Sequence, residues 1–94
     1  MNNTYDFGQL KHKNNAELVH FTLMAQSCLT KMQAAEEQGN TLKTIYWAQA
    51  TISHINQLHR IIQLVEVYKK QYEEEVADPK HIEAALELIN KLEI

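Results

Sequence analysis

The segment from Thr41 to about Ala77 carries apolar residues along two separate seams, each stepping by threes and fours. The first seam contains Ile45, Ala48, Ile52, Ile55, His59 and Ile62, and the second contains Trp47, Thr51, His54, Leu58, Ile61, Val65, Tyr68 and Tyr72. Such spacing places each set on one face of an α-helix. A helix with two apolar faces must be covered from two sides, so the pattern predicts more than a single pair of helices.

An amphipathic segment at about residues 15–38 precedes this long helix. Its inward positions are Leu18, Phe21, Ala25, Cys28, Met32 and Ala35. We expect Asn14 or Asn15 to cap its start, and Gly39 to end it in the left-handed conformation, after which Asn40 or Thr41 caps the next helix. A connection this short predicts an antiparallel helical hairpin.

The two ends of the chain are predicted to differ in structure. Residues 1–13 show no helical period over a sufficient length, so we expect an N-terminal arm before a single helical domain at 14–94. Near the other end, Asp78 and Pro79 form the clearest helix-start signal in the sequence, an N-cap followed by proline at the first helical position. The helix that follows, to about residue 93, has its inward face at Ile82, Ala85, Leu86, Ile89 and Leu92.

This third helix is expected to fold back along the distal end of the second, reach about position 62 and cover Tyr68 and Tyr72. Four residues of the second seam then have no neighbour within the chain, namely Trp47, Thr51, His54 and Leu58. Together with the adjacent Tyr46 they form our predicted partner interface, because Trp and Tyr are enriched where proteins meet. The alternatives are a break in the long helix near Asn56, or coverage of these residues by the arm.

The predicted fold class is therefore all-α: a long antiparallel helical hairpin plus a short C-terminal third helix, associating as a dimeric helical bundle of four or six helices. A composition of 45% apolar and 22% charged residues, with two glycines and one proline, is typical of a folded helical protein. Residues 1–65 carry five basic and four acidic groups, whereas residues 66–94 carry four basic and eight acidic groups. The acidic second part disfavours general nucleic-acid binding. With a single cysteine, Cys28, no membrane-length apolar run and no signal peptide, we expect a cytoplasmic protein.

No motif in the chain predicts catalysis, a cofactor or a metal site. His54 and His59 are five residues apart, which separates them by about 140° on a helix, and neither has a cysteine or carboxylate at ligand spacing. Cys28 lies on an inward stripe, where a small polarisable residue packs well. If the two histidines have a role, we expect pH sensing, with association weakening as an enclosed imidazole becomes protonated.

The sequence therefore predicts a non-enzymatic protein-binding module, such as an adaptor, an inhibitor or a chaperone-like regulator, that acts through a helical face as a homodimer. One alternative is a nucleic-acid-associated regulator that uses the basic residues Lys11, Lys13, Lys31, Lys43 and Arg60. The other is a small ligand- or metal-binding helical bundle with the histidines inside.

Overall fold

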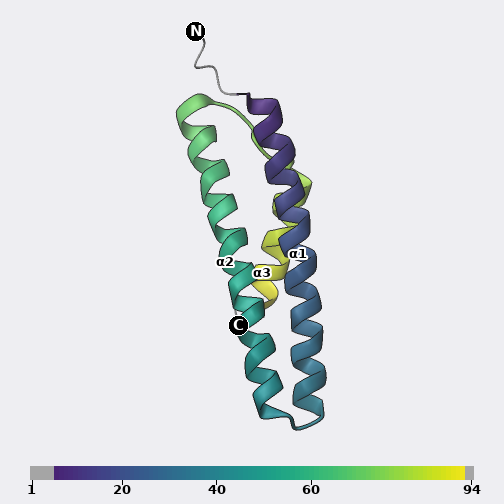
Figure 1. The fold of residues 1–94 in the computed structure, drawn as a ribbon. Helices are drawn as coiled ribbons and strands as arrows, with labels where there is room; N and C mark the ends of the chain where they lie inside the picture. The colour runs from purple at the N-terminus through teal and green to yellow at the C-terminus, as the bar shows by residue number, and fades with distance from the viewer. Residues whose placement is uncertain (1–5, 93–94) are drawn as a thin grey trace.

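Three α-helices make up the chain in the computed structural model, which describes residues 6–92: α1 (Phe7–Glu37), α2 (Thr41–Tyr72) and α3 (Pro79–Leu92). No β-strand occurs among these residues. The first two helices lie antiparallel as a long hairpin, and α3 turns back to run beside the middle of α1 (Figure 1). The predicted all-α class, with a long hairpin and a short third helix, is confirmed. The structure describes one chain, so dimerisation stays a prediction.

The turn between α1 and α2 has the predicted chemistry. Gly39 takes a φ of 70°, the left-handed conformation that glycine adopts at low cost. The side chain of Asn40 accepts a hydrogen bond of 3.1 Å from the backbone N–H of Lys43, which caps the start of α2. Three residues therefore suffice to reverse the chain.

The start of α1 differs from the prediction. Asp6 is its N-cap, and the Asp6 carboxylate accepts a hydrogen bond of 3.0 Å from the backbone N–H of Gln9. Residues 7–13, which were expected in an N-terminal arm, form the first two turns of the helix; the rest of that arm, residues 1–5, lies outside the described residues. Phe7 and Leu10 pack against the core cluster, and burial of these side chains favours the additional turns.

Asn14 and Asn15 are not helix caps, because α1 already begins at Phe7. They hold the link between α2 and α3 instead. The amide of Asn14 donates a hydrogen bond of 2.9 Å to the backbone carbonyl of Val76. The side-chain oxygen of Asn15 accepts one of 2.7 Å from the backbone N–H of Asp78. Both bonds satisfy backbone groups that lie outside regular helix, so this link is fixed on α1.

The long helix α2 is unbroken from Thr41 to Tyr72, which excludes a break near Asn56. It ends five residues before the predicted Ala77. Glu73 ends it with a φ of 55°, and its backbone N–H still bonds to the carbonyl of Lys69. Three consecutive carboxylates at residues 73–75 are unfavourable at the negative end of a helix dipole, which is consistent with the early stop.

The third helix begins at Pro79, as predicted. The core that it closes combines residues from all three helices and the link: Leu18, Leu58, Ile61, Val65, Val76, Ala77, Ala85 and Ile89. Tyr68 and Tyr72 have their ring partner in α1, since the Phe7 ring centroid is 6.2 Å from that of Tyr68 and 6.0 Å from that of Tyr72. The first turn of α1 thus helps to cover the two tyrosines, whereas the sequence predicted that the third helix would cover them.

The molecule is elongated because α3 is much shorter than the hairpin. Its radius of gyration is 16.1 Å, against about 12 Å for a compact domain of this length. The 14 residues of α3 span about 21 Å, whereas α2 has 32 residues and spans about 48 Å. Within residues 6–92, the end of the hairpin near Gly39 therefore consists of α1 and α2 alone.

Candidate protein-binding face

Parts of both α2 seams lie in the environment opposite to the one predicted: a covered seam has exposed residues, and an uncovered seam has buried ones. Leu58 and Thr51, from the second seam, are 0% and 4% exposed because α1 packs on them. In the first seam, Ile45 and Ile52 are 50% and 59% exposed. The premise that Thr51 and Leu58 have no neighbour within the chain is therefore wrong. Thr51 also donates a hydrogen bond of 2.7 Å from its hydroxyl to the carbonyl of Trp47, which satisfies the buried oxygen.

The remaining predicted interface residues lie at least partly at the surface. Tyr46 is 62% exposed, and its ring packs edge-on against that of Trp47, with 4.9 Å between centroids. Trp47 is half-buried, and the Lys31 ammonium lies 4.5 Å from its ring centroid, which brings a cation from α1 over the indole. The tip of the hairpin therefore presents a Tyr–Trp–Lys cluster built from both long helices.

The two histidines of α2 lie in different surroundings. His54 is half-buried, and its ring centroid lies 6.0 Å from that of Phe21, whereas His59 is exposed. Within residues 6–92, no group of three or more His, Cys, Asp or Glu side chains is placed to hold a metal ion. Cys28 is a buried free thiol, as its inward position predicted. pH sensing by His54 or His59 stays a prediction.

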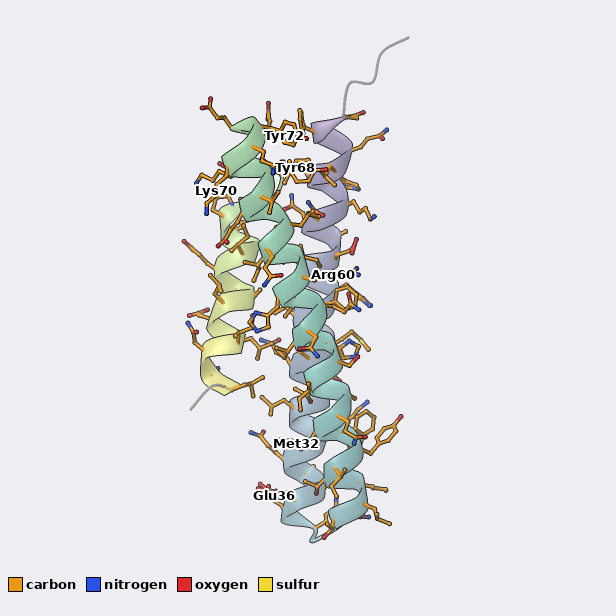
Figure 2. The ribbon with its side chains drawn as sticks, turned by 90° about the vertical axis from the view of Figure 1, so that its left-hand side faces the viewer. Met32, Glu36, Arg60, Tyr68, Lys70 and Tyr72 are labelled. Atoms are coloured by element: carbon orange, nitrogen blue, oxygen red, sulfur yellow. The ribbon has the colours of Figure 1, made fainter. Side chains whose placement is uncertain are left out.

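The hairpin is covered by α3 on one side only. On the opposite side, a groove of 460 Å³ runs between α1 and α2, and its lining includes Leu10, Lys13, Glu17, Arg60, Leu64 and Val67. Figure 2 shows Arg60 on the side of the hairpin that faces away from α3. No residue of α3 lines this groove.

Beyond the groove, helical spacing places two further lines of residues on the same side of the hairpin, toward the turn at Gly39. Side chains seven apart lie on nearly the same side of a helix. The line on α1 is Leu10, Glu17, Met24 and Lys31, and the line on α2 is Tyr46, Ser53, Arg60 and Val67. We call these eight residues, together with Trp47 and Leu64, the open face. Its two ends are fixed by the groove around Arg60 and by the contact of Lys31 with Trp47.

Charged residues are scarce along the middle of both long helices. Residues 44–59 contain no Asp, Glu, Lys or Arg, and residues 18–35 contain only Lys31. A solvated helix surface normally carries many charges, while the centres of protein interfaces are depleted of them. This gap in the charge pattern is visible in the sequence and indicates that part of the surface of these segments is suited to protein contact, although it does not show which side.

A second apolar surface lies beyond the end of α3. We call it the tip strip: Leu29, Met32, Ile45, Ala48 and Ile52. All of these except Ile45 line a shallow cavity together with Ile89 and Leu92 of α3. Figure 2 shows Met32 and Glu36 below the C-terminal end of α3, on the same side of the hairpin. On α2 the strip belongs to the first seam, which continues at Ile55 and Ile62, where the side chains pack against the core.

No helix within residues 6–92 combines the length and apolar character needed to cross a membrane. Comparisons of the chain with protein-family models, with curated proteins and with solved structures find no match. A functional assignment therefore rests on the geometry of the open face and the tip strip.

Proposed function

We propose that this protein is a non-enzymatic protein-binding module, an adaptor, inhibitor or regulator, that holds another protein on its open face. The proposal rests on one observation: a two-helix hairpin has two sides, and α3 covers only one of them. The other side exposes Tyr46, Met24, Leu64 and Val67, each at least 39% accessible. We also propose a cytoplasmic location, which a buried free thiol at Cys28 supports.

The chemistry of the open face resembles that of protein interfaces. Tyr, Trp, Met and Arg are enriched in such interfaces, and all four types occur here in Tyr46, Trp47, Met24 and Arg60. Tyr46 is 62% exposed and Met24 is 39% exposed, so both side chains are accessible to a partner.

Homodimerisation through the tip strip is the second part of the proposal. The seam Ile45–Ala48–Ile52 continues into Ile55 and Ile62, which pack against the core that α3 helps to form. A surface with the same spacing and side chains suits packing against another helix. The strip is only about 15 Å long, since α2 has about ten residues beyond the end of α3, so we expect a weak dimer.

Site-specific photocrosslinking tests partner binding directly. A benzophenone amino acid at position 46 should give adducts with a different polypeptide in cells that express the protein, because this position lies on the open face. The same amino acid at position 70 is the control, since Lys70 is exposed on the side of α2 that bears α3. The variant Met24→Glu should abolish the adduct from position 46. Equal labelling from positions 46 and 70, or no adduct with any other polypeptide, would contradict the proposal.

A further inference from the structure

Given the proposed function, we infer that the open face binds an acidic amphipathic helix of its partner protein. The helix lies along the groove between α1 and α2, with its apolar side on Met24, Trp47 and Leu64. Its carboxylates meet the basic groups that border the groove.

The charge around the open face is predominantly positive. Lys13, Arg60 and Glu17 line the groove, and Lys31 lies over Trp47 at the other end of the open face. Lys43 precedes Tyr46 and Trp47 by three and four residues, so it projects from the same part of α2. Lys13 and Arg60 therefore line the groove, whereas Lys31 and Lys43 lie nearer the turn at Gly39. Among residues 6–92, Glu17 is the one carboxylate in the groove lining.

Three of these basic side chains form no ion pair with a carboxylate within the described part of the chain. Glu17 lies 3.9 Å from Lys13, which partly balances that amine. Lys31, Lys43 and Arg60 form no ion pair within 4 Å among residues 6–92. Since opposite charges at the rim of an interface steer association and select the partner, these groups favour a partner with acidic flanks.

The shape of the groove suits a helix. On the opposite side, the hairpin already accepts α3, a 14-residue helix that buries Ala85, Leu88 and Ile89. From Tyr46 to Val67 the open face extends over 22 residues of α2, about 32 Å, which matches a helix of about 20 residues. An amphipathic helix seated in an apolar groove with anchors at spacings of three, four and seven is a common mode of recognition.

Two other occupants fit the charges less well. A second copy would place Lys31 and Arg60 against a face of the same positive sign, which opposes association. Nucleic acid would meet widely spaced basic groups around an apolar centre on a chain of net charge −3. An acidic helix satisfies both the apolar centre and the basic border.

The experiment uses Trp47, the single tryptophan of the chain, as a fluorescent probe within the proposed site. Two 20-residue helical peptides share one leucine face and carry either glutamate or lysine on both flanks. Titrated into the full-length protein, the glutamate peptide should bind, and its dissociation constant should rise about tenfold in the variant Lys31→Glu/Arg60→Glu. Binding should also weaken with added salt. Lys70→Glu, on the α3 side, is the matched control and should leave the dissociation constant unchanged.

Each other outcome overturns the inference. Equal or tighter binding of the lysine peptide would show that charge does not select the partner. The same conclusion would follow if the double charge reversal left the dissociation constant of the glutamate peptide unchanged in a variant with unchanged helical circular dichroism. Binding of a duplex oligonucleotide in preference to the glutamate peptide would show that the basic residues around the open face bind phosphate groups. If the glutamate peptide fails to bind while position 46 still crosslinks to a polypeptide in cells, the acidic helix is excluded and the protein-binding function stands. If both fail, both are excluded.

Discussion

The side-chain amide of Asn14 donates a hydrogen bond of 2.9 Å to the backbone carbonyl of Val76, which lies 62 positions further along the chain. Asn14 is 2% exposed and Val76 is fully buried. One polar side chain in the middle of an apolar seam thus fixes the link between α2 and α3 on α1. The neighbouring bond from Asp78 to Asn15 repeats this connection on the next residue.

Replacement of Asn14 by leucine should destabilise the protein by about 2 kcal/mol, because the carbonyl of Val76 would remain buried without its donor. Urea denaturation followed by circular dichroism measures this difference. Asn56→Leu is the control, since Asn56 is exposed on α2, and it should change the free energy of unfolding by less than about 0.5 kcal/mol. Equal stability of the two variants would show that the Asn14 bond contributes little.

Glu73→Gly should stabilise the protein by about 0.5–1 kcal/mol. Glu73 ends α2 with a φ of 55°, a conformation that costs free energy for a residue with a Cβ and little for glycine. Glu74 has no positive φ, so Glu74→Gly removes a similar charge without this benefit and should be neutral or destabilising. Thermal unfolding of the two variants compares them directly, and a lower melting temperature for Glu73→Gly than for Glu74→Gly would contradict the assignment.

The two seams of α2 can be distinguished by matched truncations. Leu58→Ala should cost about 3 kcal/mol of stability, because Leu58 is fully buried between the helices. Ile52→Ala should cost less than about 1 kcal/mol, because more than half of the Ile52 surface is already exposed to solvent. The reverse order in urea denaturation would restore the sequence-based assignment of Leu58 to a partner interface.

Introduction of a charge in the tip strip should abolish self-association without unfolding the chain. Ile52→Glu places a carboxylate within the strip, where a second copy would have to bury it. Light scattering across a concentration series should show a dimer for the wild-type chain at high concentration and a monomer for this variant. Ser53→Glu adds the same charge at an exposed position on the open face, about 100° around the helix from Ile52, and should leave the dimer intact. A wild-type chain that remains monomeric at all concentrations would exclude the dimer.

Local sequence signals predicted most of the fold. Helix ends depend on backbone geometry and capping, which involve only neighbouring residues. The sequence therefore located the turn at Gly39 and Asn40 and the helix start at Asp78 and Pro79. The start of α1 was missed because Asn14 interrupts the apolar line from Phe7 to Leu18. Its partner carbonyl belongs to a residue 62 positions away, so no local pattern indicates that this asparagine is buried.

The candidate site was predicted less well for a different physical reason. Both seams of α2 have helical spacing and similar apolar content, so spacing alone does not show which of them α1 covers. The choice depends on how α1 and α2 pack, and the structure places Leu58 inside and Ile52 outside. Tyr46 is exposed and Trp47 is half-buried, so both stay at least partly accessible.

The helix α3 ends at Leu92, well short of the turn at Gly39, and this unequal length divides the molecule into two parts of different rigidity. Near Asn14 and Val76, three helices and a hydrogen-bonded link hold one another in place. Around Tyr46 and Trp47 only two helices pack, and amide hydrogens there should exchange with solvent at a lower free energy of opening. The segment that carries the aromatic contact residues is thus the one that can adjust its shape to an incoming surface.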